Sequence, residues 1–492
     1  MGGGNGGGGS PQEQEDKYKD AKDAKELLDR IGEEVYKEKV KNAANVFRDY
    51  LKGDLNKANN ASDETISSLD PCNSDYTTRL NGKRHPCDKR SPVRFSDEYG
   101  GQCTFNRIKD NETDDNKCGA CAPYRRLHLC DYNLEKMDST KIKDKNVLLA
   151  EVCYAAKYEG ESLKTYREQY DATYPGSGST MCTMLARSFA DIGDIIRGRD
   201  LYSGNKKEKK QREQLENKLK DIFKNIYNEL TNGRNGVKER YKDTDNYYEL
   251  REDWWTANRD QVWKAITCGT HEGDTYFRPT CSDSERSGTF SQANKYCRCN
   301  DDKPNADKPN TDPPTYFDYV PQFLRWFEEW GEDFCRKKKK KLENVQKQCR
   351  GEYQGEERYC SRNGYDCEKT KRAIGKYRMG NQCTKCLFAC NPYVEWIDNQ
   401  RKQFDKQKKK YDEEIKKYEN GASSSRRQKG GTNITNYEGY EKKFYEELKD
   451  KYGTVDAFLG LLSKEKTCTA VKDTEGGKID FKQVNSGSAS DS

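Results

Sequence analysis

Twenty cysteines constrain the fold of this chain of 492 residues more than any other feature of its sequence. They are unevenly spaced and only three histidines accompany them, a combination that favours disulfide bonds over metal sites. Because cytosolic thiols stay reduced, the pattern predicts a disulfide framework formed in an oxidising, extracellular compartment. We expect all twenty to form disulfides, with the pairing left open: Cys72, Cys87, Cys103, Cys118, Cys121, Cys130, Cys153, Cys182, Cys268, Cys281, Cys297, Cys299, Cys335, Cys349, Cys360, Cys367, Cys383, Cys386, Cys390 and Cys468.

Two short motifs offer zinc as an alternative use for some of these thiols. Cys118 and Cys121, and likewise Cys383 and Cys386, have the spacing of a zinc-ligand pair, and Cys390 follows the second pair closely. The disulfide interpretation is favoured, because the many remaining cysteines need an oxidising compartment in which these would also pair. We therefore expect no bound metal and no cofactor.

Nothing in the sequence predicts an enzyme. His85, His128 and His271 are isolated from one another, and a disulfide-rich chain argues against a free catalytic thiol. The Gly-Ser repeat at 176–179 lacks the flanking strand and the spacing of a nucleophile elbow, and neither a phosphate-binding loop nor a dinucleotide fingerprint occurs. We expect no catalytic residues.

Composition predicts a thin aliphatic core built by helices. The chain is 35% charged, 11% aromatic and 32% hydrophobic, so aromatic side chains and cross-links must supply much of the stability, while the length suggests two to four packed units. In 321–349, Phe323, Phe327, Trp330 and Phe334 recur at the three- and four-residue steps of one helix face. Similar stripes predict an N-terminal amphipathic helix from Tyr18 and helices over 146–157, 180–199, 215–230, 251–268, 392–418 and 440–452, whereas 72–130 and 268–319 read as irregular.

Acidic residues also occur on two of these expected helices. Asp191 and Asp194 lie on the helix expected over 180–199, and Glu328 and Glu329 lie on the one expected over 321–349, each pair with arginine neighbours in the sequence. We expect them on helix surfaces, where ion pairing is the default explanation.

The segments group into an N-terminal part and three further units. We predict an N-terminal segment over 1–70, a Cys-rich loop unit over 71–180, helical bundles over 181–320 and 321–470, and a tail over 471–492. Residues 1–17 are mostly glycine and polar or charged side chains, without the apolar stretch of a secretory signal, and no run of about 18 apolar residues occurs. We expect the ectodomain part of a larger membrane-anchored protein, with no insertion of this part into a membrane.

Positive charge is concentrated in one region. The chain carries a net charge of +6, yet residues 331–410 contain 22 Lys and Arg against 11 Asp and Glu, which leaves −5 for the rest. Such a patch favours a polyanion such as a sulfated glycan, a sialylated surface or nucleic acid, and the alternative is a solvated helix surface. The candidate ligand-binding residues are Arg336, Lys337, Lys338, Lys339, Lys340, Lys341, Lys406, Lys408, Lys409, Lys410, Arg426, Arg427 and Lys429, with Lys83, Arg84, Lys89 and Arg90 around Cys87 as a second patch.

Several blocks of sequence resemble a known family. LARSFADIGDIIRGRDLY at 185–202, REDWWTANRDQVWKAITC at 251–268 and PQFLRWFEEWGEDFC at 321–335 are similar to the signature blocks of the Duffy-binding-like alpha domain. CAPYRRLHLC at 121–130 resembles an earlier Cys-rich block of the same domain, and the N-terminal amphipathic segment resembles the one that precedes it. This domain heads the malaria-parasite erythrocyte membrane protein family of variant surface antigens.

The resemblance implies a mainly α, disulfide-laced Duffy-binding-like fold: an N-terminal helix, a loop-rich first subdomain and two helical bundles. It also implies a monomeric host-cell adhesin at the infected erythrocyte surface, binding heparan sulfate, blood-group sugars or a complement receptor during rosetting, with no nucleic acid partner. The matched blocks are scaffold, so no family binding residue transfers to a position here. Two hypotheses follow: a domain whose cationic helices bind sulfated glycosaminoglycan, and a structural presenter that orients an adjacent receptor-binding domain and takes part in antigenic variation.

Overall fold

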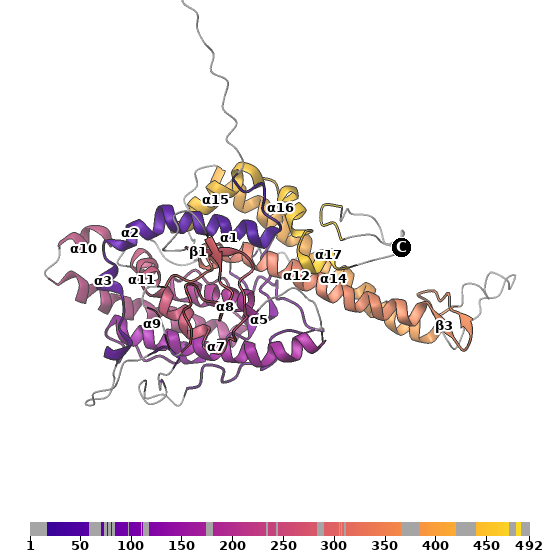
Figure 1. The fold of residues 1–492 in the computed structure, drawn as a ribbon, viewed down its shortest axis with the longest axis horizontal. Coiled ribbons are helices and arrows are strands. Elements are labelled where there is room, and N and C mark those ends of the chain that lie inside the picture. Colours follow the sequence, from indigo (N-terminus) through magenta and orange to yellow (C-terminus); the bar gives the residue numbers. More distant parts are fainter. Residues whose placement is uncertain are drawn as a thin grey trace, which may run out of the picture.

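Helices account for most of the described chain, as the apolar stripes predict (Figure 1). The computed structural model describes residues 17–58, 70–72, 76, 80, 84–96, 98–109, 111, 118–173, 181–232, 235–242, 245–282, 290–304, 306, 308, 311–365, 383–419, 439–471 and 479–483. The expectation of a mainly α fold laced by disulfides is confirmed. No helix among these residues combines the length and the apolar character that a bilayer span requires.

The N-terminal segment lies across the body as a broken helix. Helix α1 (Ala24–Val35) starts at Asp23, whose carboxylate accepts a hydrogen bond from the Glu26 backbone N–H at 2.8 Å, as an N-cap residue does. Figure 1 shows α1 running along the body beside α15, and the two helices are in contact. The remaining elements of the segment are a π-helical turn (Tyr36–Val40), α2 (Lys41–Asn45), α3 (Arg48–Leu51) and a 3-10 turn (Leu55–Lys57).

The first subdomain is mostly loop up to a long helix. Helices α5 (Tyr124–Leu127) and α6 (Tyr132–Glu135) are single turns, whereas α7 (Lys145–Thr173) has 29 residues. The prediction of a short helix ending near residue 157 is therefore wrong. Packing on α11 (Tyr248–Ile266) accompanies the continuation: a Cβ at Gly160 would lie 2.0 Å from the Ile266 carbonyl oxygen, so glycine at this position lets the two helices pack closely.

Four helices and a hairpin form the second subdomain. The helices are α8 (Met181–Ile196), α9 (Lys206–Thr231), α10 (Asn235–Arg240) and α11 (Tyr248–Ile266). Every residue of α8 is buried, and α8 and α11 match the predicted spans 180–199 and 251–268 to within about three residues. The predicted start of α9 at 215 is wrong: the helix begins at Lys206 behind a capping box between Asn205 and Glu208, in a charged stretch that shows no apolar stripe.

The stretch before α12 is less irregular than its sequence suggests. Strands β1 (Pro279–Ser282) and β2 (Phe290–Gln292) pair antiparallel, and a 3-10 turn (Phe317–Tyr319) leads into α12. The expectation of an irregular 268–319 missed this hairpin, because strands of four and three residues are too short to show an alternating pattern.

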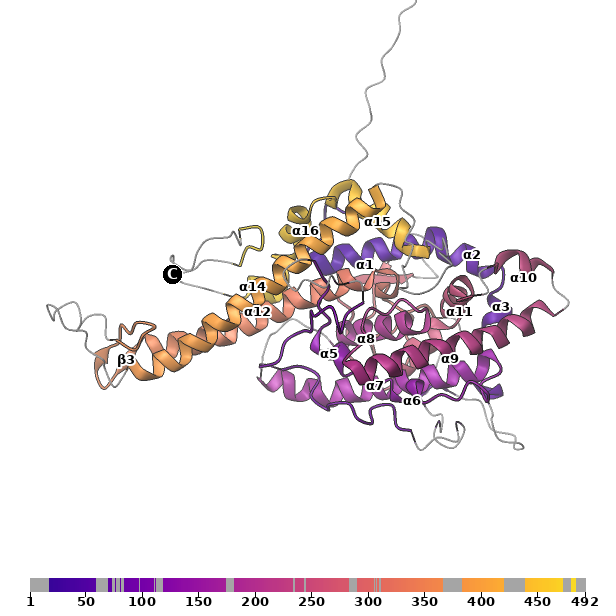
Figure 2. The same ribbon diagram turned by 180° about the vertical axis from the view of Figure 1, so that it is seen from behind.

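The third subdomain contributes a two-helix projection. Helix α12 (Gln322–Cys349) packs antiparallel on α14 (Thr384–Glu419), and both extend beyond the body to the small hairpin of β3 (Glu352–Tyr353) and β4 (Glu356–Glu357) (Figures 1 and 2). The predicted start of α14 near Pro392 is wrong, since Pro392 lies inside the helix. The subdomain closes with α15 (Gly439–Tyr452), α16 (Val455–Leu462) and α17 (Lys466–Thr469).

Eight disulfides join sixteen of the cysteines that the structure describes. The pairs are Cys72–Cys268, Cys87–Cys130, Cys103–Cys121, Cys182–Cys297, Cys281–Cys299, Cys335–Cys468, Cys349–Cys386 and Cys360–Cys383.

Cys118, Cys153 and Cys390 belong to none of these eight bonds, and for these three residues the expected disulfide stays a prediction. Cys153 lies fully buried within the hydrophobic core, and the Cys118 sulfur lies 2.8 Å from a Glu413 carboxylate oxygen. The Cys390 sulfur lies 3.6 Å from that of the bonded Cys349. Cys367 is outside the described residues.

Candidate functional site

The described cationic residues singled out in the sequence fall on three parts of the structure. The first is the arm, which we define as α12 from Arg336 to Cys349 together with α14 from Thr384 to Lys402, and which projects away from the body (Figures 1 and 2). The second is α14 from Lys406 to Lys410, and the third is the loop around the Cys87–Cys130 disulfide. Lys83, Arg426, Arg427 and Lys429 lie outside the described residues.

At the base of the arm, two of the candidates are built into the packing. Arg336 and Lys337 are only 5% and 3% exposed, and both form ion pairs with Asp333, at 2.7 Å in the case of Lys337. The Lys337 ammonium also donates a hydrogen bond to the Tyr99 carbonyl oxygen of the first subdomain at 3.0 Å. Lys337 therefore joins α12 to the loop that carries Tyr99, and a ligand would reach Arg336 or Lys337 only by displacing these contacts.

Further along α12 the lysines become accessible. Lys340 is exposed, and Lys338, Lys339 and Lys341 are half-buried. The Lys341 ammonium lies 5.6 Å from the centre of the Trp396 ring on α14, so its stem covers the aromatic seam between the two helices while its charge stays near solvent. This run forms the cationic part of the arm.

The lysines of α14 divide in the same way. Lys406 and Lys410 are each 8% exposed, with Lys406 donating to the Cys103 carbonyl oxygen at 3.4 Å and Lys410 paired with Glu414 at 2.7 Å. Lys408 is half-buried and Lys409 is exposed. The sequence therefore marked both structural and solvent-facing lysines as candidates, because a run of like charges covers all sides of a helix.

The antiparallel register separates the two lysine runs. Phe334 stacks on Trp396 at 5.5 Å between ring centres, and Trp330 stacks on Phe404 at 5.6 Å. Residues 338–341 of α12 thus lie level with about residue 394 of α14, so at 1.5 Å per residue they are roughly 20 Å along the helix from 406–410. The two runs form separate cationic regions.

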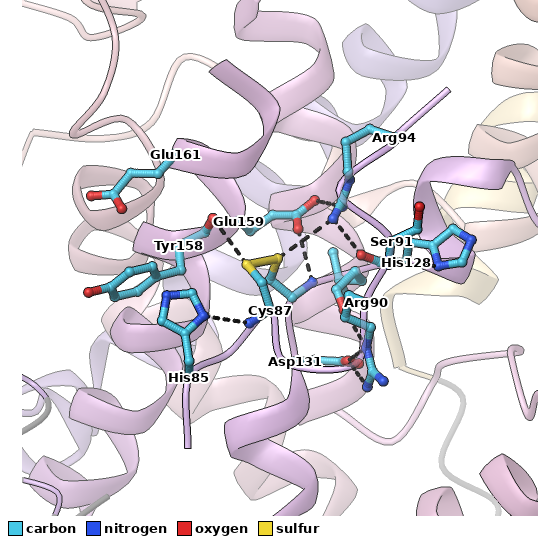
Figure 3. The surroundings of a disulfide bond; sticks show 12 residues. His85, Cys87, Arg90, Ser91, Arg94, His128, Asp131, Tyr158, Glu159 and Glu161 are labelled. Carbon is cyan, nitrogen blue, oxygen red and sulfur yellow. Dashed lines mark hydrogen bonds and ion pairs between the residues drawn. A yellow bond between two sulfur atoms is a disulfide. The ribbon is translucent and has the colours of Figure 1, made fainter. Parts of the chain in front are cut away.

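Around Cys87, most of the described candidate charges are also paired. The Arg90 guanidinium binds Asp131 (Figure 3) at 2.7 Å and Glu135 at 2.9 Å. Arg84 lies 3.4 Å from a Glu151 oxygen. The opposing carboxylates are themselves buried. These arginines therefore hold the loop to α6 and α7.

Lys89 differs from these arginines in exposure. It is exposed, lies in the left-handed region with φ of 62°, and its ammonium is 5.0 Å from the Tyr132 ring centre. Among the described members of this patch, it is the one that faces solvent most fully.

The surroundings of the Cys87–Cys130 disulfide are rigid. The backbone N–H of Cys130 donates to Glu159 at 3.0 Å, and the same carboxylate accepts the Arg94 guanidinium at 2.5 Å (Figure 3). His128, next to this pair, has a lowered pKa because of burial, to which the positive charges of Arg94 and Arg90 add. The Cys87–Cys130 disulfide and the contacts with Glu159 therefore hold the loop that carries Lys89 in place.

The sequence analysis did not predict a network of buried ion pairs in the core of the molecule. Arg325 binds Asp191 at 2.8 Å and Asp194 at 2.6 Å, and Arg125 binds Asp191 at 2.7 Å and Glu329 at 2.9 Å. The expectation that these carboxylates lie on helix surfaces is wrong, although their ion pairing is confirmed: Asp191 and Asp194 are 0% exposed, and Glu329 is 5% exposed.

Burial has a measurable electrostatic consequence in this network. Burial alone would raise the pKa of Asp191, but the Arg125 and Arg325 guanidiniums outweigh it and lower that pKa to about 2. For Asp194 burial prevails, and its pKa is raised. The signal available in the sequence was the presence of Arg and Asp within the otherwise apolar block LARSFADIGDII at 185–196.

Comparison with known proteins places this arrangement in a family. Residues 119–325 match the Duffy binding domain, 329–490 match the C-terminal subdomain of the Duffy-binding-like domain, and 23–59 match the N-terminal segments of PfEMP1. The Duffy receptor of Plasmodium vivax (strain Salvador I) is 23% identical over 317 residues, which are 61% of this chain and 22% of that protein. The chain spans about a quarter of the length of the curated relatives it matches.

Two solved structures from the Plasmodium falciparum varO strain are more similar. The NTS-DBL1(alpha-1) domain of PfEMP1 is 37% identical with a TM-score of 0.72, and the alignment covers 94% of this chain and 91% of that one. The double domain of NTS-DBL1-alpha and CIDR-gamma is 36% identical with a TM-score of 0.73, covering 93% of this chain and 62% of that one.

Helical bundles, disulfides and matched blocks together define a Duffy-binding-like adhesion domain, a class that is not enzymatic. The chain belongs to the PfEMP1 family, as an N-terminal segment followed by a Duffy-binding-like domain from the head of the ectodomain. The resemblance seen in the sequence and the expectation of a non-enzyme are confirmed. The class is a family of host-binding adhesion domains.

Proposed function

We propose that this domain is a host-cell adhesin that binds sulfated glycosaminoglycan on erythrocytes, from the surface of the infected cell, during rosetting. The observation that carries the proposal is the lysine run 338–341 on the projecting arm, where Lys340 is exposed and the other three are half-buried (Figure 1). A polysulfated chain attracts such a run over a distance and releases counterions when it binds. Lys408, Lys409 and Lys89 offer further accessible charge.

Arg336, Lys337, Lys406, Lys410, Arg84 and Arg90 support the proposal in a different way. They contact Asp333, Glu414, Glu151, Asp131 and carbonyl oxygens inside the molecule, so we assign them to holding the arm and the loop in place. We assign the contacts with sulfate to the more accessible lysines, because a charge-assisted hydrogen bond needs a donor that the ligand can reach.

The experiment is retention of the oxidised domain on heparin as a function of salt. Replacing Lys338–Lys341 with serine should elute the domain at lower salt and reduce the slope of log affinity against log salt by roughly one for each lysine that contacts a sulfate. The matched control replaces four lysines of α9, Lys206, Lys207, Lys209 and Lys210, which are also exposed on a helix. Equal losses in both variants, or no loss in the first, would contradict the proposal.

A second candidate function is that of a structural presenter for an adjacent receptor-binding domain, with its surface varied against antibodies. It is supported by the burial of arginines from the sequence blocks that resemble the family. Arg125, Arg187 and Arg325 are each at most 3% exposed. A domain that binds neither heparin, nor blood-group glycans, nor complement receptor, yet stiffens its neighbour in a tandem chain, would favour this function.

A further inference from the structure

Two of the eight disulfides have one cysteine that is only half-buried. They are Cys87, which is bonded to Cys130, and Cys268, which is bonded to Cys72. The other fourteen bonded cysteines are buried, and none of them is more than 8% exposed. A disulfide opens when a thiolate attacks one of its sulfurs, so access decides which bond reacts and which of its two sulfurs is attacked. A thiol in solvent should therefore attack Cys87 and Cys268 first.

At both of these bonds a guanidinium contacts the sulfur of the buried partner. The Arg94 Nη1 group donates to Cys130 Sγ at 3.6 Å (Figure 3), and the Arg298 Nη2 group donates to Cys72 Sγ at the same distance. Within the described residues, no sulfur of the other six bonds accepts a hydrogen bond from an arginine or a lysine. The two accessible disulfides thus share a feature that the buried ones lack.

The guanidinium favours opening of the bond from the accessible side. When a thiolate attacks Cys87, the electron pair of the broken S–S bond leaves with the Cys130 sulfur, and a positive neighbour stabilises the thiolate that forms. Arg94 is 0% exposed, and its guanidinium is held beside this sulfur by the Glu159 carboxylate at 2.5 Å and by the His128 carbonyl oxygen. It is therefore in place before the negative charge develops.

The negative charge of Glu159 is itself compensated by hydrogen bonds. Its carboxylate accepts the Arg94 guanidinium, the Cys130 backbone N–H at 3.0 Å and the Ser188 hydroxyl at 2.6 Å. Burial, together with the positive charges of Arg94 and Arg90, also lowers the pKa of the nearby His128, so a further positive charge is disfavoured there. The surroundings of Cys130 therefore suit a leaving thiolate.

We propose that Cys87 and Cys268 are sites of thiol–disulfide exchange with a low-molecular-weight thiol. The attacking sulfur bonds to Cys87 Sγ, the Cys87–Cys130 bond breaks, and Cys130 leaves as a thiolate beside Arg94. The proton of the attacking thiol passes to solvent, and the number of disulfide bonds is unchanged. At Cys268 the leaving sulfur is that of Cys72, beside Arg298.

Exchange at Cys87 removes one of the bonds that hold the loop carrying Lys89. The proposal goes beyond the adhesion function and does not depend on it.

The test exposes the full oxidised chain to reduced glutathione at neutral pH, stops the exchange with acid and maps the products by peptide mass spectrometry. Free thiols are labelled with N-ethylmaleimide after denaturation, and label that is present before glutathione is added is subtracted. Glutathione should appear on Cys87 and Cys268, with the label on Cys130 and Cys72, while the other six bonds stay intact.

The two arginines serve as controls for each other within one molecule. Arg94→Met should slow exchange at Cys87 by about three- to tenfold and leave exchange at Cys268 unchanged, and Arg298→Met should do the reverse. A variant that only loosened the fold would expose Cys87 and speed up its reaction, so the sign of the change separates the two causes. If Arg94→Met fails to fold, Arg94→Lys keeps a positive charge but not the planar fork that reaches both Glu159 and the sulfur, and should slow exchange less.

Three results would overturn the proposal. The first is a buried disulfide that opens as fast as the two accessible ones. The second is glutathione on Cys130 or Cys72 in place of their half-buried partners. The third is exchange at Cys87 that the Arg94 variants leave unchanged or accelerate, because the arginine would then act only in holding the fold.

Discussion

Replacing Arg325 with methionine should test whether buried charge pairs hold the subdomains together. Arg325 is 2% exposed and donates four hydrogen bonds: to Asp191 at 2.8 Å, to Asp194 at 2.6 Å, and to the carbonyl oxygens of Phe317 at 3.3 Å and Val320 at 2.7 Å. Methionine has a similar length and removes all four. The carboxylates that it leaves come from α8, whereas Arg325 is on α12.

The magnitude follows from what remains around the two carboxylates. Removing one partner of a buried ion pair costs about 3–5 kcal/mol. Asp191 keeps Arg125 at 2.7 Å and Asp194 keeps Arg197 at 3.0 Å, so neither is left without a positive neighbour. We therefore expect the unfolding free energy to fall by about 3 kcal/mol at pH 7, the lower end of that range.

The loss should shrink as the pH falls. In the wild-type chain the pKa of Asp191 is lowered to about 2, and the stability that this shift supplies is present above the unfolded value near 4 and is lost below it. Without Arg325, burial raises the pKa of Asp191 and raises that of Asp194 further. Asp191 and Asp194 of the folded variant then take up protons at a pH where the same carboxylates of the unfolded chain are still ionised. The difference in unfolding free energy between the variant and the wild type should therefore become smaller from pH 7 to pH 5.

The assay is guanidinium unfolding of the oxidised chain, followed by tryptophan fluorescence at pH 7 and pH 5. The control is Arg362→Met, because Arg362 is exposed and donates a 3.0 Å hydrogen bond to Asn391, so a change within about 0.5 kcal/mol is expected. A loss below about 1 kcal/mol for Arg325→Met at pH 7, or one equal at both pH values, would refute the reasoning.

Three further predictions concern single features of the fold. Burial raises the pKa of Glu151 to about 7 against the opposing effects of Asn133 and Arg84, so the wild-type stability should fall as the pH rises from 4.5 to 7. Glu151→Gln should remove this pH dependence and increase the unfolding free energy by up to about 3 kcal/mol at pH 8. Unfolding midpoints measured across this pH range test the prediction. Gly160→Ala should cost about 3 kcal/mol, because its Cβ would lie 2.0 Å from the Ile266 oxygen. Gly269→Ala, whose Cβ would meet Lys164 at 3.4 Å, should be nearly neutral, and thermal unfolding compares the two. Replacing both Cys335 and Cys468 with serine opens a loop of 133 residues and should cost up to about 5 kcal/mol, so an unchanged unfolding midpoint would contradict it.

The sequence predicted helix ends well where the apolar stripe reaches them. Helix α9 ends at Thr231, one residue past the predicted stripe, but it starts at Lys206, nine residues before that stripe begins, because the Asn205 capping box lies in a charged stretch without apolar period. The end of α7 and the start of α14 depend on distant contacts. Gly160 reads as a helix-weakening residue until Ile266 is placed against it, and the disulfides of Cys383 and Cys386 anchor α14 ahead of Pro392. Periodicity contains no information about such partners.

The candidate site shows the same limit for charged residues. The lysine run on α12 was visible in the sequence, but not the division between Lys337, whose ammonium reaches Tyr99, and Lys340, which is exposed. Likewise, Arg125 and Glu329 are 204 positions apart, so their pairing could be seen only in the folded chain. An acidic residue off the apolar stripe was assigned to the surface, because stripe analysis treats charge as solvated unless a partner is known.

The fold thus keeps two populations of charge apart, and this separation bears on the proposed adhesion. Arg125 and Arg325 bind carboxylates on other helices inside the molecule, so these ion pairs connect the helices of the scaffold. Replacing either arginine is therefore expected to destabilise the fold. A ligand-binding surface of exposed lysines can therefore vary in sequence while the scaffold beneath it stays the same, which is what a variable adhesin requires.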